Sequence, residues 1–133
     1  MSIDPTPTLT STEIADIHAA MVAKLLKPGT DILDNLTPTG CDLIHAVMGI
    51  AGEAGELIDA VKKAVIYRKP IDLDNVVEEL GDLEFYIEAL RQILNISREY
   101  TLIKNYDKLE GGDKARYKDG YSDAAAIERK DKS

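Results

Sequence analysis

Two short stretches of the sequence decide the fold: GIAGEAGEL at residues 49–57 and EELGD at residues 78–82. Each contains two acidic residues three positions apart, and each lies inside a longer run whose apolar residues recur at intervals of three and four. That periodicity is typical of amphipathic helices. The sequence therefore predicts two consecutive helices, each carrying a pair of carboxylates.

The first of these helices is expected over residues 42–67. The second is expected to follow a short turn, with Asp72 as its N-cap, and to continue to about Leu94. Apolar residues spaced at three and four predict further helices on either side, at residues 12–26 with Ser11 or Thr12 as N-cap, from Ser97 to about Leu109, and near residues 123–129. No segment alternates like a strand, so the expected fold class is all-α.

The remaining segments give the expected domain layout. Residues 32–40, which contain a proline and a glycine, are expected to form a loop. We expect an irregular lead-in at residues 1–11, a helical domain at residues 12–110, and a charged segment at residues 111–133. That last segment either contributes to the functional site or is partly disordered.

Length and charge exclude several classes of protein. A chain of 133 residues is long enough for one domain with a core. The net charge of −8 argues against binding to a nucleic-acid polymer or a membrane surface, both of which need clustered lysine and arginine. One cysteine cannot form an intrachain disulfide, and no run of 18 apolar residues is present. We expect a cytoplasmic protein.

The second acidic pair lies within the apolar stripe of its helix. On a wheel of 100° per residue, Asp82 is about 60° from Glu79, and Ile93 falls between them. Apolar residues fill the arc of about 100° on the other side of Glu79; these are Val76, Leu80, Leu83, Ile87, Leu90 and Leu94. Tyr86 lies about 20° from Glu79, on the side of Asp82. These two carboxylates are therefore directed toward the core rather than opposite it.

The first acidic pair, Glu53 and Glu56, lies at the edge of a core face among small residues. Ionised carboxylates in a helical bundle each cost several kcal/mol unless they are compensated. Lys62 and Lys63 cannot neutralise four carboxylates from one side, whereas two Mg²⁺ ions bring four positive charges. The alternative is a solvated acidic edge that has a period of three by chance.

Together the two acidic pairs resemble the MazG-like branch of the all-α nucleoside triphosphate pyrophosphohydrolases, whose signature is ExxE on one helix and ExxD on the next. The resemblance covers residues 42–129 and is closest to the short phage-type chains. Other matching positions are Lys62-Lys63, residues 68–72, Tyr86, Asn105, Lys108-Leu109, Arg116-Tyr117, residues 120–122 and Arg129. The chain differs in having about four additional residues between Leu109 and Arg116, and Phe85 where a tryptophan is common.

The resemblance implies a four-helix bundle that is completed by oligomerisation, as a dimer or a tetramer. It implies hydrolysis of a (d)NTP between the α and β phosphates, which gives a (d)NMP and pyrophosphate. It makes Glu53, Glu56, Glu79 and Asp82 the catalytic metal ligands for two or more Mg²⁺ ions, with Mn²⁺ as a substitute. The expected location is the host cytoplasm if a phage encodes the chain.

The resemblance and the residue types together suggest substrate contacts. The expected substrate-binding residues are Asn105, Lys108, Lys63, Lys62, Tyr86, Arg116 and His45. Members of the family it resembles that take dCTP or related pyrimidines often use a tryptophan in the base pocket, and this chain has none. A guanine edge offers donors that an acidic side chain can accept. The expected substrate is therefore a purine nucleotide such as dGTP or GTP.

Three alternatives remain from the sequence. One is a house-cleaning hydrolase of pyrimidine nucleotides such as dCTP and dUTP. Another is a non-catalytic acidic helical adaptor or antitoxin that binds a basic partner. The third, a di-iron protein, is disfavoured because that chemistry uses Glu-x-x-His and no glutamate here has a histidine three residues later.

Overall fold

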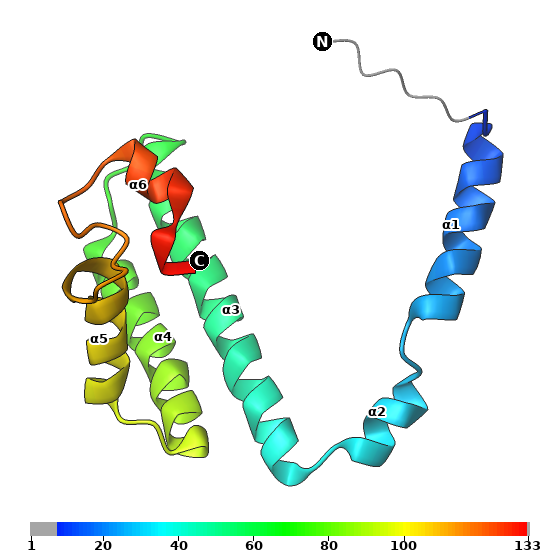
Figure 1. Cartoon of the computed structure of the whole chain (residues 1–133), viewed down its shortest axis with the longest axis horizontal. Helices are drawn as coiled ribbons and strands as arrows, with labels where there is room; N and C mark the ends of the chain where they lie inside the picture. Colours follow the sequence, from blue (N-terminus) through cyan, green and yellow to red (C-terminus); the bar gives the residue numbers. More distant parts are fainter. Residues whose placement is uncertain (1–7, 133) are drawn as a thin grey trace. The chain divides into compact units, whose positions relative to one another are not determined.

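The computed structural model describes residues 8–132, and every regular element in that range is helical (Figure 1). The all-α class is therefore confirmed. The chain divides into two compact units, Met1–Thr37 and Pro38–Ser133. Residues 1–7 of the predicted irregular lead-in lie outside the described residues.

The first unit contains α1, Ser11–Leu25, and α2, Gly29–Asn35. The N-cap of α1 is Thr10, so the prediction of Ser11 or Thr12 was wrong by one residue or two. Thr10 and Glu13 form a capping box: the Glu13 amide donates to the Thr10 hydroxyl at 3.2 Å, and the Thr10 amide donates to the Glu13 carboxylate at 2.7 Å. The glutamate three residues after the cap was the signal that identifies Thr10.

The loop predicted for residues 32–40 was also wrong. Residues up to Asn35 belong to α2, and the next helix begins at Pro38. Proline suits the first position of a helix because its missing N–H would have no intrahelical partner there and its fixed φ is already helical. In this segment Pro38 therefore starts a helix.

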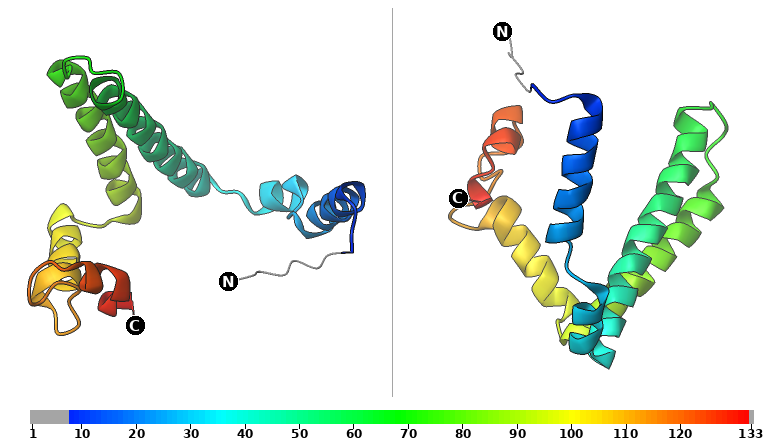
Figure 2. Two further views of the ribbon diagram at one scale, coloured as in Figure 1. Left: turned by 90° about the horizontal axis from the view of Figure 1, so that it is seen from above. Right: turned by 90° about the vertical axis from the view of Figure 1, so that its right-hand side faces the viewer.

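The second unit is built on a helical hairpin of α3, Pro38–Val65, and α4, Leu73–Leu94. The two helices run antiparallel and lie side by side in both views of Figure 2. The turn between them contains Arg68 in a left-handed conformation, with φ of 53°. Asp72 caps α4 as predicted, because its carboxylate accepts a hydrogen bond from the Asn75 amide at 3.1 Å.

Gly49 allows the two helices of the hairpin to approach closely. A Cβ atom at Gly49 would overlap the ring of Tyr86 on α4. At Gly52 and Gly55, one and two turns further along α3, an added Cβ would have no neighbouring atom within 4 Å among the described residues. Of Gly49, Gly52 and Gly55, it is therefore Gly49 that packing inside the hairpin explains.

After the hairpin come α5, Arg98–Tyr106, a π-helical turn at Asp107–Gly111, α6, Asp123–Glu128, and a 3₁₀ turn at Lys130–Lys132. Ser97 caps α5 as predicted. The α-helix ends three residues before Leu109, because the chain widens into the π-helical turn. The additional residues between Leu109 and Arg116 include the glycines that this turn needs. A Cβ at Gly111 would overlap the Tyr106 ring, and a Cβ at Gly112 would overlap the Asp107 carbonyl oxygen.

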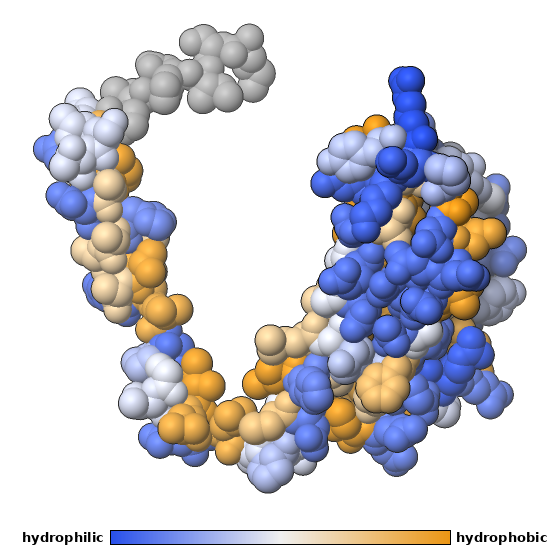
Figure 3. Space-filling model, turned by 180° about the vertical axis from the view of Figure 1, so that it is seen from behind, coloured by the Kyte–Doolittle hydropathy of each residue, from blue (hydrophilic) through white to orange (hydrophobic). Residues whose placement is uncertain are grey.

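Large apolar side chains remain on the surface of both units (Figure 3). Among the described residues, the buried apolar side chains are the small ones of Ala46, Ala60 and Ala115. No helix among residues 8–132 is long and apolar enough to cross a membrane.

Candidate functional site

Three of the four predicted metal ligands meet on the α3–α4 hairpin. Glu53 of α3 and Glu79 and Asp82 of α4 each offer a carboxylate oxygen, and these oxygens all lie within 4.8 Å of one another. The antiparallel register of the hairpin brings the two acidic pairs, separated by 22 residues in the sequence, to the same level. We refer to these three residues as the carboxylate cluster.

Glu56, the fourth predicted ligand, lies beside the carboxylate cluster rather than in it. Partial burial raises the pKa of the Glu79 carboxyl, and the neighbouring negative charges of Glu53, Glu56 and Asp82 raise it further. A hydrogen bond with Glu53 adds to this shift. The site therefore holds like charges close together, as expected where a cation is to bind.

The donor set of the cluster fits a hard divalent cation. All three side chains offer oxygen, and magnesium and manganese prefer oxygen ligands. A zinc site would call for nitrogen or sulfur donors, and neither occurs in this group. The chemistry of the residues thus agrees with the predicted Mg²⁺ or Mn²⁺.

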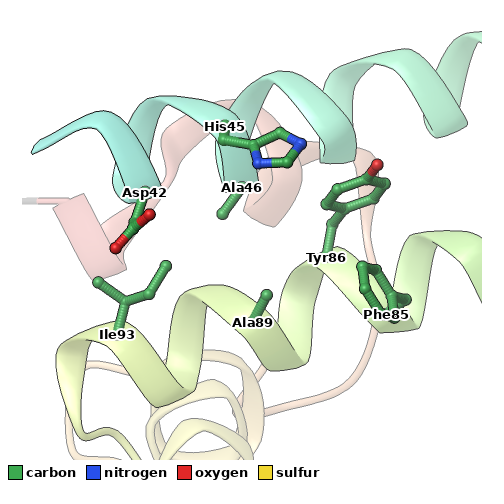
Figure 4. Close-up of a pocket in the computed structure, with 7 residues that line it drawn as sticks. All are labelled: Asp42, His45, Ala46, Phe85, Tyr86, Ala89 and Ile93. Atoms are coloured by element: carbon green, nitrogen blue, oxygen red, sulfur yellow. The ribbon is translucent and has the colours of Figure 1, made fainter. Parts of the chain in front are cut away.

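A pocket of about 220 Å³ lies between α3 and α4 (Figure 4). We name it the Tyr86 pocket; its lining residues are Asp42, His45, Ala46, Phe85, Tyr86, Ala89 and Ile93. The Tyr86 ring meets the rings of His45 and Phe85 edge to face, with centroids 5.9 and 5.1 Å apart. The two predicted substrate contacts His45 and Tyr86 are therefore brought together by the fold.

The predicted lysines of α3 lie on the other side of the cluster, toward the turn. The Lys63 ammonium is 2.8 Å from the Asp59 carboxylate, and both side chains are more than half exposed. Lys63 also lines a polar pocket of about 350 Å³ with Lys69 and Asn75 at the α3–α4 turn. The Lys62 ammonium instead lies 5.7 Å from the centre of the Tyr67 ring.

The remaining predicted contacts lie beyond the hairpin. Asn105 is on α5 and Lys108 is in the π-helical turn, and both are exposed. The Arg116 guanidinium donates two hydrogen bonds, of 2.7 and 3.0 Å, to the buried carboxylate of Asp131. The positive charge of Lys108 acts on the same carboxylate. Lys108, Arg116 and Asp131 therefore form a second polar group beyond the hairpin.

Sequence reasoning missed two acidic residues that the structure makes prominent. Asp42 lines the Tyr86 pocket, eleven residues before Glu53, and its helical spacing to His45 was the signal that could have found it. Asp131 is distant from Arg116 in sequence and lies in a weakly periodic tail. No local pattern could have indicated that pair.

Comparison with known proteins gives the family. The model of the MazG nucleotide pyrophosphohydrolase domain matches residues 44–116, which is more than half of the chain and includes both acidic pairs. The chain is also 31% identical over 78 residues to the Gene 37 protein of Mycobacterium phage L5, an alignment that covers 53% of this chain and 68% of the phage protein. No solved structure matches. The chain belongs to the MazG nucleotide pyrophosphohydrolase family.

Proposed function

We propose that the protein is a metal-dependent (d)NTP pyrophosphohydrolase that cleaves between the α and β phosphates. Water is consumed, the bridging P–O bond breaks, and the products are a (d)NMP and pyrophosphate. The observation that carries this proposal is the carboxylate cluster, in which three side chains from two helices converge although their charges repel one another. Membership in a family of nucleotide pyrophosphohydrolases supports it.

Glu53, Glu79 and Asp82 would hold Mg²⁺ or Mn²⁺. Glu56, whose negative charge acts on Glu79, would share in binding a second ion. Bound divalent ions would neutralise the triphosphate, lower the pKa of a water and stabilise the charge that develops on the phosphate oxygens. A carboxylate of the group that is not occupied as a ligand would orient the attacking water by accepting a hydrogen bond from it.

The pockets on either side of the cluster suggest how the substrate lies. On α3 the residues of the Tyr86 pocket precede Glu53, and Lys63, in the polar pocket at the α3–α4 turn, follows it. On α4 the residues of the polar pocket come before the acidic pair and those of the Tyr86 pocket come after it, as the antiparallel register requires. We place the base against the rings of His45 and Tyr86 and the phosphates toward Lys63. Aromatic rings contribute about 1–3 kcal/mol per stacked base.

The other predicted contacts complete this proposal. Lys62 is a candidate for a phosphate contact from α3. Asn105, Lys108 and Arg116 are candidates for sugar and phosphate contacts from the C-terminal part of the 12–110 helical domain and the 111–133 segment that follows it. The Arg116 guanidinium keeps its ion pair with Asp131 while it faces a phosphate, because a guanidinium has five N–H donors.

A pyrophosphate-release assay over a panel of nucleotides tests the proposal. With Mg²⁺ present, we expect turnover of purine nucleotides, with dGTP or GTP as the best substrate, and no turnover with chelator. If dCTP or dUTP reacts ten times faster than dGTP, the purine preference is wrong and the pyrimidine house-cleaning alternative is right. Absence of pyrophosphate release from every nucleotide would contradict the hydrolase and favour a non-catalytic partner-binding protein.

A further inference from the structure

The Tyr86 pocket contains one carboxylate, that of Asp42, and Asp42 has no role in the proposed chemistry. Figure 4 shows Asp42 extending from α3 toward Ile93 of α4, at the end of the pocket away from the rings of Tyr86 and Phe85. The Asp42 carboxylate has no ion pair within the described residues, and the other lining side chains are aromatic, aliphatic or the imidazole of His45.

The position of Asp42 along α3 suits contact with the far edge of a base. Asp42 precedes Glu53 by eleven residues, which at 1.5 Å per residue is about 17 Å along the helix axis. His45 precedes Glu53 by about 12 Å on the same measure. A nucleotide whose phosphates lie at the carboxylate cluster and whose base contacts His45 therefore directs the outer edge of that base toward Asp42.

A carboxylate at that edge selects among bases by their hydrogen-bond donors, because it has two acceptor oxygens and no donor. Guanine presents two adjacent donors, the N1–H and the N2 amino group, and a carboxylate can accept both in a bidentate, charge-assisted pair. Adenine and cytosine present an amino group beside an acceptor nitrogen. Uracil and thymine present one N–H between two carbonyl oxygens, which a carboxylate repels.

We propose that Asp42 is a specificity-determining residue that accepts the N1–H and N2–H donors of guanine, so that the substrate class is guanine nucleotides. This inference rests on the proposed function, because it assumes that the phosphates lie at the carboxylate cluster. It goes beyond that function by assigning the choice of base to one side chain in the Tyr86 pocket.

The kinetic test compares dGTP with dITP, which lacks the N2 amino group, and with the xanthine nucleotide dXTP, which carries a carbonyl in its place. For the unchanged protein we expect kcat/KM for dGTP to exceed that for dITP by tenfold or more, since a site built for a donor rejects the analogue that lacks it. In Asp42→Asn, the amide can accept from N1–H and donate to the xanthine carbonyl. We expect dGTP to lose at least tenfold and dXTP to gain.

Asp113→Asn is the matched control, because Asp113 is an exposed acidic residue outside the pocket and its substitution removes the same charge. The control should keep the dGTP to dITP ratio of the unchanged protein. A dGTP to dITP ratio that is the same in Asp42→Asn as in the unchanged protein would overturn the proposal.

A binding measurement separates this inference from the proposed hydrolase. Titration of dGMP and dIMP, followed by NMR or calorimetry, requires neither turnover nor a metal. Tighter binding of dGMP that Asp42→Asn removes, in a protein that hydrolyses no nucleotide, would support the assignment of Asp42 while contradicting the hydrolase. Turnover of (d)NTPs with equal binding of dGMP and dIMP would keep the hydrolase and overturn the role of Asp42.

Discussion

At the scale of single residues, the environment of Glu79 defines the candidate site. Its pKa is raised first by partial burial and then by three neighbouring carboxylates. A raised pKa means that the folded protein holds this proton more tightly than the unfolded chain does. The group therefore favours folding below its ordinary pKa, and that contribution is lost as the pH rises through the raised value. At neutral pH the metal-free cluster opposes folding.

Neutralising one member of the cluster should separate function from stability. We expect Glu53→Gln and Asp82→Asn each to lower turnover by at least about 100-fold, because each removes one of the proposed metal ligands. In chelator, the melting temperature of each variant should equal or exceed that of the unchanged protein, since repulsion is relieved. Millimolar Mg²⁺ or Mn²⁺ should raise the melting temperature of the unchanged protein by mass action and that of the variants less.

The opposite pattern would show that these carboxylates serve a structural purpose. That pattern is a lower melting temperature for both variants in chelator, together with no effect of metal on the unchanged protein. A protein loses stability when a carboxylate that forms a salt bridge or a helix cap is neutralised.

Gly49 gives a second prediction at this scale. Gly49→Ala places a methyl group against the Tyr86 ring, so we expect a loss of about 1–3 kcal/mol in the free energy of unfolding, the usual cost of overpacking. Gly52→Ala is the control in the same helix, because nothing lies within 4 Å of its Cβ position among the described residues. It should be neutral or stabilising by up to about 1 kcal/mol. Denaturant titration of both variants is the measurement, and equal effects would contradict the close approach at Gly49.

At the scale of elements, the C-terminal segment is held by side chains rather than by a large core. The Asp131 carboxylate is 2% exposed and receives two hydrogen bonds from Arg116, which follows the π-helical turn. The Arg116 and Tyr117 amides also donate to the Lys108 and Leu109 carbonyl groups at 2.9 and 2.8 Å. This network connects the 3₁₀ turn at Lys130–Lys132 to the π-helical turn at Asp107–Gly111.

The ion pair makes the order of this segment dependent on pH. The Arg116 guanidinium lowers the pKa of the Asp131 carboxyl. The pair therefore contributes its full stability above the ordinary aspartate pKa of about 3.9, and the contribution is lost as the pH falls through the lowered value. At pH 7 we expect residues 113–132 of Asp131→Asn to exchange amide hydrogens several times faster than those of the unchanged protein, and the difference should shrink below about pH 4.

Asp113→Asn serves as the control for that experiment, since Asp113 is exposed and lies in the same segment. It should leave exchange unchanged at both pH values. A difference between Asp131→Asn and the unchanged protein that persists undiminished at low pH would show that charge is not what holds the segment.

At the scale of the whole molecule, the apolar faces need a covering partner. One face of α3 lines an open apolar groove of about 590 Å³; the residues of this groove are Ala54, Leu57, Ile58, Val61, Lys62, Val65 and Ile66. Ile58 and Val65 are 67% and 69% exposed. Fully burying one such side chain contributes about 1.5–3 kcal/mol to the free energy of unfolding. Burying several of them would therefore add an amount comparable to the whole stability of a domain.

We therefore predict a homo-oligomer, a dimer or a tetramer. Light scattering at micromolar concentration should give a mass of at least twice 14.6 kDa. Ile58→Asp should reduce that mass, because it places a charge in the groove, whereas Glu78→Gln on the exposed face of α4 should not change it. A monomer at micromolar concentration would contradict the prediction.

The sequence by itself determined the helical class, the hairpin that carries the acidic pairs, and the caps at Asp72 and Ser97. These features depend on spacings of three and four residues, which local helical geometry converts directly into faces and ends. The same local rules misplaced the start of α1 and missed α2, because Pro38 was interpreted as a helix breaker although proline also begins helices.

Only the tertiary structure decided which side chains meet. The convergence of Glu53 with Glu79 and Asp82, and the position of Glu56 beside them, depend on the antiparallel register of α3 and α4. The Tyr86 ring packs against Gly49 of the neighbouring helix, and Arg116 pairs with Asp131 fifteen residues away. Such contacts join residues that no periodic pattern relates, so their energies appear only once the chain has folded back on itself.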